Sequence, residues 1–219
     1  MIVEKMKQRS AAWHKARLGI PTASSFDKIL SPKALKSSTQ AKAYRMQLLA
    51  EWITGVPKDT ASSGFMERGT MLELEALRWY EMEHNVDVEQ VGLVLRDDRM
   101  CACSPDGLVG KDGGLEIKCP SAATHVDYLL SGLDDYHGQV QGAMWLSGRA
   151  WWDLLSYCPG MPAVSVRFER SEAYAEAIER EMDGFLRLLK VEREHLIRLG
   201  CKPAARVVLL AGQDSEDPF

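Results

Sequence analysis

Two carboxylates and an amine stand close together in the segment CSPDGLVGKDGGLEIKCP, residues 103–120. Asp106 follows a proline, the chain turns through Lys-Asp-Gly-Gly, and Glu116 and Lys118 lie on a short β-rich stretch. Side chains two residues apart on a strand point to the same face, so Glu116 and Lys118 share a face and Ile117 points to the other. A hairpin would bring Asp106 back beside Glu116. The spacing therefore predicts that two acids and one lysine meet.

Two carboxylates at this separation repel each other unless a cation lies between them. Such oxygen ligands suit Mg²⁺ or Mn²⁺, which bind through a few carboxylates together with water and substrate phosphates. The metal activates water and stabilises the charge that develops on phosphorus, and a lysine can orient that water. The predicted chemistry is hydrolysis of a phosphodiester. The alternative is that Asp106 lies at the top of a turn and that Glu116 and Lys118 form a cross-strand surface pair.

The elements that must position these residues are indicated by apolar spacing and by glycine and proline. Residues 37–57 have the periodicity of a helix that stops at Gly55. A second helix, within residues 65–85, places Glu73 on an otherwise apolar side. A carboxylate that faces inward needs a partner or a role.

Residues 86–120 contain short β-rich pieces, which we expect to form a meander of neighbouring antiparallel strands. A helix, two strands and a long helix are predicted to follow at residues 135–148, 150–159, 163–170 and 171–199. This order predicts the α/β class, with a mixed central β-sheet flanked by helices. The length fits one domain, residues 1–219, with a frayed acidic tail from about residue 212.

The composition is that of an ordinary globular protein, with 46% hydrophobic and 26% charged residues. The absence of a long apolar run or signal-peptide pattern predicts a cytoplasmic protein without a membrane segment. The five cysteines lack metal-binding or disulfide spacing, so Cys101 and Cys103 are expected to be buried in the core. A reducing compartment is consistent with that usage.

The net charge of -4 conceals an uneven distribution along the chain. Residues 1–58 carry 11 Lys and Arg against 3 acids, whereas the rest carries 16 against 28. A basic face beside an acidic one would serve a nucleic-acid-binding protein. The alternative is that these lysines only solvate helix faces and loops.

Four segments occur in the order found in the phage lambda exonuclease family, also called YqaJ-type viral recombinases, and resemble its motifs. They are AWHKARLGIPTAS (12–24), RGTMLE (68–73), SPDG with LEIK (104–107 and 115–118), and YHGQVQGAMW (136–145). The third resembles the PD-(D/E)xK nuclease motif. The resemblance implies a restriction-endonuclease-like PD-(D/E)xK core.

The resemblance also implies roles for individual residues. The catalytic set would be Asp106, Glu116, Lys118, Glu73 and Gln139, with Lys118 serving the attacking water and Gln139 helping to position it. The metal ligands would be Asp106, Glu116, the backbone carbonyl of Ile117, and Glu73. Arg17 would receive a 5'-terminal phosphate, assisted by the hydroxyls of Ser24 and Ser104. An arginine suits this role because its planar fork grips two phosphate oxygens.

The implied function is that of a metal-dependent 5'-to-3' exonuclease acting processively on double-stranded DNA ends. It would use Mg²⁺, or Mn²⁺, with two ions per active site, and bind duplexes with 5'-phosphorylated ends. The 3' single-stranded tails would pass to a single-strand annealing protein for homologous recombination. The family also implies a homotrimeric ring and a phage or prophage protein in a bacterial host. The alternatives are an endonuclease or junction resolvase of the same fold, and a non-catalytic DNA-binding recombination scaffold.

Overall fold

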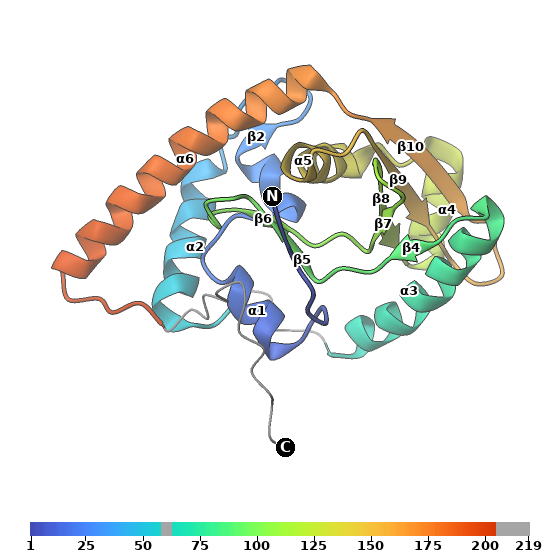
Figure 1. The fold of residues 1–219 in the computed structure, drawn as a ribbon, viewed down its shortest axis with the longest axis horizontal. Coiled ribbons are helices and arrows are strands. Elements are labelled where there is room, and N and C mark those ends of the chain that lie inside the picture. The colour runs from blue at the N-terminus through green and yellow to red at the C-terminus, as the bar shows by residue number, and fades with distance from the viewer. Residues whose placement is uncertain (58–62, 205–219) are drawn as a thin grey trace.

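The structure is a computed structural model that describes residues 1–57 and 63–204. Its centre is a five-stranded mixed sheet with the strand order β10-β9-β8-β7-β4 (Figure 1). These strands are Val88–Glu89 (β4), Gly107–Val109 (β7), Gly113–Lys118 (β8), Trp151–Ser156 (β9) and Val164–Glu169 (β10). Strand β8 runs parallel to β9, and the other neighbouring pairs are antiparallel. The predicted α/β class with a mixed central sheet is confirmed, while the predicted acidic tail lies outside the described residues.

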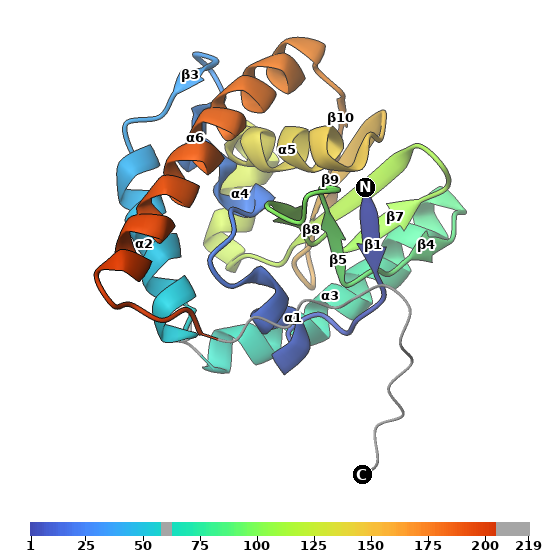
Figure 2. The same cartoon turned by 60° about the vertical axis from the view of Figure 1, so that its left-hand side comes forward.

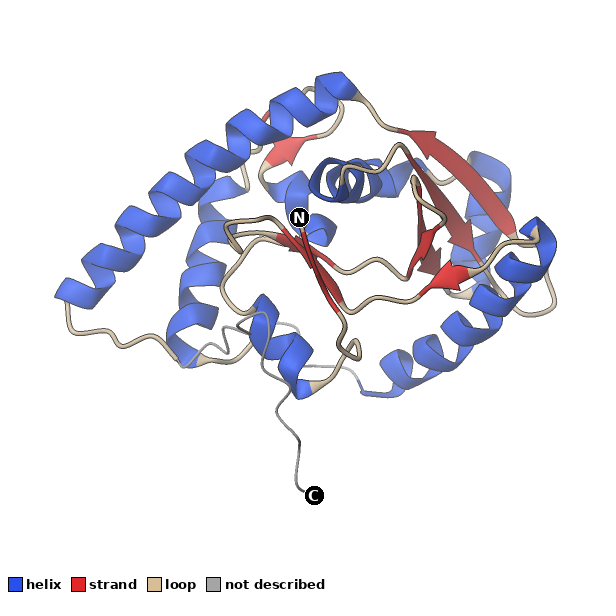
Figure 3. Ribbon diagram, viewed as in Figure 1, coloured by secondary structure: helices blue, strands red, loops and turns tan. Residues whose placement is uncertain are grey.

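Two smaller sheets accompany the central one (Figure 3). One has the order β1-β5-β6, and the other pairs β2 with β3. Their strands are Ile2–Glu4 (β1), Leu30–Ser31 (β2), Lys36–Ser37 (β3), Leu93–Leu95 (β5) and Ala102–Cys103 (β6). The expectation of a single meander over residues 86–120 is therefore wrong, because β5 pairs with β1 and β6, and neither β5 nor β6 pairs with β7 or β8. Pro105 lies between β6 and β7 and has no N–H to donate to a ladder, so the chain leaves one sheet there and enters the other.

The helices match the predicted periodicity except at the N-terminus. Their bounds are Ala11–Arg17 (α1), Ala41–Thr54 (α2), Ser63–His84 (α3), Ala122–Ser131 (α4), His137–Ser147 (α5) and Glu172–Arg198 (α6), with 3-10 turns at Ala23–Lys28 (η1) and Asp134–Tyr136 (η2). Helix α2 ends at Gly55, whose φ of 71° lies in the left-handed region that glycine adopts without strain. Helix α1 has only 7 residues, too few to show a period; Ser10 caps it by accepting a hydrogen bond from the Trp13 N–H.

The central sheet lies between α3 on one face and α5 on the other, with α6 packed against α5 (Figure 2). Leu77 and Tyr80 of α3 share a hydrophobic cluster with Leu115 and Ile117 of β8. Successive residues of a strand face opposite sides, so Glu116 points away from α3 and toward the α5 layer, as the sequence predicted.

A buried ionic cluster fixes α3 on the sheet. The Tyr80 hydroxyl donates to Asp153 Oδ2 at 2.6 Å, and Arg167 donates to both oxygens of the same carboxylate at 2.8 Å. Asp153 is only 2% exposed, so its charge depends on these partners. Glu73 lies two turns before Tyr80 on α3, and its position is thereby tied to β9.

The segment after α1 is fastened to β6 and α2. The Ala102 N–H donates to the Pro21 carbonyl at 3.1 Å, and the Thr22 N–H donates to the Tyr44 hydroxyl at 3.2 Å. These bonds hold the end of α1 beside the loop that follows β6. Among the described residues, each helix is too short or too polar to cross a lipid bilayer.

The predicted burial of two cysteines is confirmed. Cys101 is 0% and Cys103 2% exposed, and neither forms a disulfide. Burial raises the pKa of Cys101 to about 12, despite an opposing charge from Arg96, and burial also raises that of Cys103. Both thiols are therefore neutral core groups.

The contact between β8 and β9 leaves no space for a side chain at Gly114. A methyl group there would clash with the indole ring of Trp152, which is 0% exposed. We expect Gly114→Ala to lower the free energy of unfolding by about 2 kcal/mol or more, as overpacking does. Urea denaturation followed by circular dichroism measures this change.

The matched control is Gly184→Ala on α6, where the nearest atom to a new methyl group is Arg187 Nη2 at 4.0 Å. An alanine inside a helix is favoured over glycine by about 0.5–1 kcal/mol, so this variant should be as stable as the wild type or more so. Equal unfolding free energies for the two variants would show that β8 and β9 are not packed as described.

Candidate active site

Three of the predicted catalytic side chains meet beside the C-terminal half of β8. Glu116 is 7% exposed, and its Oε1 accepts hydrogen bonds from Lys118 Nζ at 2.8 Å and from Gln139 Nε2 at 2.6 Å. Lys118 Nζ also donates to Gln139 Oε1 at 3.2 Å. Gln141, two residues further along α5, turns away and bonds the backbone of Glu169, so only Gln139 reaches the group.

Asp106 lies on the edge of β8 that β7 leaves open. Strand β7 begins at Gly107 opposite Leu115, and past that point Asp106 Oδ2 accepts the Ile117 N–H at 2.6 Å. The N–H and C=O of one strand residue point to the same edge, so the Ile117 carbonyl is directed toward the side on which Asp106 lies. The predicted hairpin is present, and it places the first acid next to the predicted carbonyl ligand.

Glu73 approaches the same edge from α3. Its Oε1 accepts a hydrogen bond from Arg9 Nη2 at 2.6 Å, and it lines a cavity together with Asp106 and Ile117. The nearby Glu75 instead accepts from the Tyr157 hydroxyl at 2.6 Å, which orients it elsewhere. Of Glu73 and Glu75, Glu73 is therefore the one that lines this cavity.

The surroundings of Asp106 and Lys118 change the pKa values of both groups. Burial, and then the charges of Glu116 and Glu73, raise the pKa of Asp106 well above its usual range, although the bond from the Ile117 N–H favours the ionised form. Burial disfavours the Lys118 ammonium, but the charge and hydrogen bond of Glu116 outweigh this effect and raise the pKa of Lys118. Lys118 is thus held protonated, while Asp106 resists ionisation.

The donor types suit a hard divalent cation: carboxylates from three elements and one backbone carbonyl. The raised pKa of Asp106 fits this interpretation, because a cation beside it would favour the ionised form. In the present conformation no three His, Cys, Asp or Glu side chains of residues 1–57 and 63–204 converge closely enough to hold a metal ion. Glu116 is engaged by Lys118 and Gln139, and Glu73 by Arg9.

A second cavity lies on the other face of β8. It is lined by Glu116, Lys118 and Gln139 and also by Arg17, Ser24 and Ser104, the three residues predicted to bind phosphate. Gln8 and Arg9 line both cavities, so the two adjoin at that point. All the side chains predicted from the sequence therefore line two neighbouring hollows around the end of β8.

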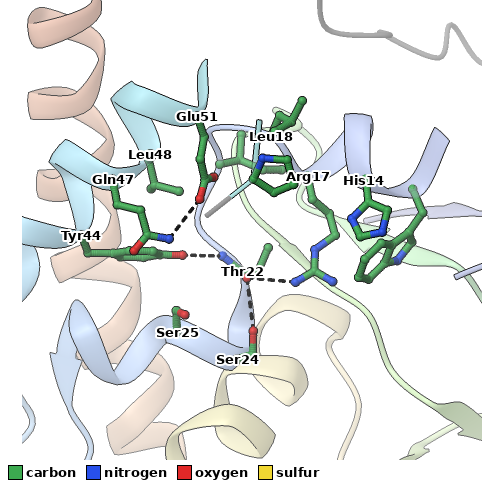
Figure 4. A pocket seen from close by; sticks show the side chains of 13 residues that line it. His14, Arg17, Leu18, Thr22, Ser24, Ser25, Tyr44, Gln47, Leu48 and Glu51 are labelled. Carbon is green, nitrogen blue, oxygen red and sulfur yellow. Dashed lines mark hydrogen bonds between the residues drawn. The ribbon is translucent and has the colours of Figure 1, made fainter. Parts of the chain in front are cut away.

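Arg17 is a sheltered cation at the end of α1 (Figure 4). Its guanidinium lies 3.9 Å from the centre of the Trp13 ring and donates long hydrogen bonds to Ser104 Oγ at 3.5 Å and Thr22 Oγ1 at 3.4 Å. Burial lowers the pKa of Arg17, and no carboxylate of the described residues forms an ion pair with it. A half-buried guanidinium whose hydrogen-bond partners in the described part of the chain are neutral is suited to receive an anion.

Three further residues belong to the site. Thr22 bonds both Arg17 and Ser24, and the Tyr136 ring centre lies 4.5 Å from Lys118 Nζ. Thr22 and Tyr136 both lie in segments that resemble family motifs, which is a signal that could have identified them. Arg9 precedes every recognisable motif, and its contact with Glu73 spans 64 residues, so the sequence carries no sign of it.

Comparisons with known proteins found a family model and solved structures that are similar to this chain. A family model described as the YqaJ-like viral recombinase domain matches residues 12–150. The solved structure of an alkaline exonuclease, LHK-Exo from Laribacter hongkongensis, is similar at 33% identity and a TM-score of 0.76, covering 87% of this chain and 98% of that chain. LHK-Exo in complex with dAMP matches with 34% identity and a TM-score of 0.77, with the same coverage of 87% and 98%.

A phage related exonuclease from Haemophilus somnus has 14% identity and a TM-score of 0.57, over 88% of this chain and 97% of that chain, and so shares the fold. No curated protein sequence matches this one.

The electrostatics of Asp106 predict a stability effect. Folding raises the pKa of Asp106, so above the unfolded-state pKa its titration destabilises the metal-free fold, and stability is regained as the pH falls. We expect Asp106→Asn at pH 8 in chelator to melt about 2–4 °C above the wild type, which corresponds to about 1 kcal/mol for a chain of this size. Differential scanning calorimetry measures the shift.

The control for this comparison is Asp87→Asn, an exposed residue between α3 and β4, which should melt with the wild type. An Asp106→Asn melting temperature at or below that of the wild type would mean that the acids are not in electrostatic conflict.

Proposed function

Because the chain belongs to the YqaJ-like viral recombinase domain family, we propose that it is a metal-dependent 5'-to-3' exonuclease of double-stranded DNA. It would act processively and leave 3' single-stranded tails for homologous recombination by strand annealing. One observation carries the proposal: the Glu116, Lys118 and Gln139 group shares a cavity with Arg17, a half-buried cation that forms no ion pair with a carboxylate of residues 1–57 or 63–204. A hydrolytic group and a phosphate receptor thus lie within reach of one substrate terminus. The similarity to an alkaline exonuclease supports the same class of reaction.

The metal ligands would be Asp106, Glu116, the Ile117 carbonyl and Glu73, binding Mg²⁺, or Mn²⁺, as two ions per site. When bound, the metal would lower the pKa of a coordinated water and stabilise the charge that develops on the phosphate.

The protein groups would position the water and the DNA. Gln139 is held by its bond to Glu116 and presents an amide that can orient water, while the Lys118 ammonium, fixed between Glu116 and the Tyr136 ring, can stabilise negative charge on the phosphate. Water would form a new bond to phosphorus, and the bond from phosphorus to the 3' oxygen of the terminal nucleotide would break, that oxygen leaving with a proton. The remaining strand then carries a new 5'-phosphate.

Arg17 would bind the 5'-terminal phosphate, with Ser24 and Ser104 at its sides. Its fork geometry suits a terminal phosphate, which offers more free oxygens than a phosphate within the strand. Since each cleavage creates another 5'-phosphate, the same receptor can hold the end after every step. This provides a physical basis for processive action.

We further propose a homotrimeric ring around the DNA. Its support is the excess of Lys and Arg in residues 1–58, which could line a channel while the acidic remainder faces outward. The product tails would pass to a single-strand annealing protein in the bacterial cytoplasm, as expected of a phage or prophage enzyme whose five cysteines are all free. A particle mass of one chain, with and without duplex DNA, would contradict the ring.

The deciding experiment is digestion of end-labelled linear duplexes carrying a 5'-phosphate or a 5'-hydroxyl, beside closed circles, with Mg²⁺ or with chelator. We expect mononucleotides from the 5'-phosphorylated strand, slower digestion of the hydroxyl end, intact circles, and no digestion in chelator. Lys118→Ala should lose cleavage by at least about a hundredfold while still binding duplex DNA, since it removes charge stabilisation at phosphorus. Efficient cutting of circles would instead indicate an endonuclease or junction resolvase, and no cleavage by the wild type would indicate a DNA-binding scaffold.

The role of Arg17 predicts a change of end preference. Charge-assisted hydrogen bonds contribute about 1.5–3 kcal/mol, so Arg17→Ala should lower kcat/KM on the phosphorylated end about ten- to a hundredfold and leave the hydroxyl end nearly unchanged. Its control is Arg180→Ala, a surface arginine of α6 paired with Glu181. A preserved preference for phosphate in Arg17→Ala would remove Arg17 from the phosphate site.

A further inference from the structure

Arg9 is a cation at the junction of the two cavities. Its side chain lines the hollow of Glu116 and Lys118 as well as that of Glu73 and Asp106. Its Nη2 lies 2.6 Å from Glu73 Oε1, and the two side chains are 38% and 27% exposed. Arg9 is therefore a close and partly exposed partner of the carboxylate that α3 contributes to the site.

The backbone of Arg9 is held in an unfavourable conformation. Its φ is 65°, in the left-handed region where a side chain is strained and glycine is not. The next residue, Ser10, caps α1, so the chain enters that helix directly from the strained residue. An arginine kept where glycine would fit more easily indicates a use for its side chain at this place.

The charge of Arg9 acts on both acids of its cavity. The hydrogen bond with Glu73 raises the pKa of Arg9 against the effect of burial, and the charges of Glu73 and Asp106 add to the rise. Lys118 has the corresponding place beside Glu116. Each of these two glutamates thus has a nitrogen cation of its own, and the acids of the described part of the chain do not converge into a metal-binding cluster.

We propose that Arg9 is a positioning residue that neutralises Glu73 in the metal-free protein and competes with the divalent cation for this carboxylate, so that it sets the metal affinity of the site. The inference rests on the proposed function, because it takes Glu73 as a metal ligand. Arg9 would weaken metal binding in two ways. The ion pair must open before Glu73 can bind metal, and a guanidinium close to the metal repels it.

The test is isothermal titration of the full chain with Mn²⁺ alone, without DNA, so that catalysis plays no part. Four proteins form a double-mutant cycle: the wild type, Arg9→Gln, Glu73→Gln and the double variant. Glutamine keeps a long polar side chain and the same backbone strain as arginine, whereas glycine would relieve the strain and confuse the comparison.

We expect Arg9→Gln to bind Mn²⁺ about three- to tenfold more tightly than the wild type, a change in the range of a partly shielded ion pair and its charge effect. In the Glu73→Gln background the same change should tighten binding clearly less, because only the repulsion between the guanidinium and the metal is then removed. In chelator, Arg9→Gln should also melt below the wild type, because Glu73 then lacks its cation, and Mn²⁺ should raise its melting temperature more. Arg9→Lys keeps the charge and should bind Mn²⁺ nearly as the wild type does.

Arg99→Gln is the matched control. Arg99 also has a positive φ, 58°, and also pairs with a glutamate, Glu4 at 2.9 Å, on the small sheet. Its Mn²⁺ affinity should equal that of the wild type. An unchanged or weaker affinity in Arg9→Gln, or an equal tightening in the Glu73→Gln background, would overturn the competition and leave the proposed nuclease intact. A wild type that binds no Mn²⁺ would overturn both.

Discussion

Strand β8 is covered on both faces, and this constraint decides what each of its residues can do. Leu115 and Ile117 are packed against α3, while Gly114 lies beneath the Trp152 ring without room for a side chain. A slip of one residue would exchange the two faces and move Glu116 into an apolar cluster. The packing of the central sheet thereby fixes the face of β8 from which Glu116 and Lys118 project.

The β7–β8 ladder ends early, and this leaves one edge of β8 open near Ile117. Because β7 starts at Gly107, the backbone N–H of Ile117 has no strand partner on that edge and bonds the Asp106 carboxylate. One short strand pair thus provides both a side-chain acid and an edge where a backbone carbonyl faces it. Helix α3 reaches this edge through its apolar stripe, and the Tyr80 bond to buried Asp153 prevents it from sliding along the sheet. Glu73 is positioned by the same contacts that hold the fold together.

The sequence predicts the parts of the molecule that follow local periodicity. Helices α2, α3, α5 and α6 and the β8 alternation obey simple spacing, and the hairpin that returns Asp106 beside Glu116 follows from a proline and two glycines. The placement of β5 and β6 in a separate sheet depends on the pairing of β5 with β1, a contact over about 90 residues that no local pattern predicts. Arg9 was missed for the same reason, whereas Thr22 and Tyr136 were within reach of the motif comparison.

The charges of the site are arranged in a way that a purely structural role does not explain. Arg17 and Glu116 line the same cavity, yet the guanidinium bonds only hydroxyls and packs on an indole ring, while the carboxylate is bonded by Lys118 and Gln139. A direct ion pair between these two groups would offset part of the desolvation cost of each charge. Kept apart, they leave the Arg17 end of this cavity suited to an anion, and the adjoining cavity, which Asp106 and Glu73 line, suited to a cation. Under the proposed function, the phosphate of a DNA terminus would supply the anion and a divalent metal the cation, so the separation of the two charges would make the site complementary to that substrate.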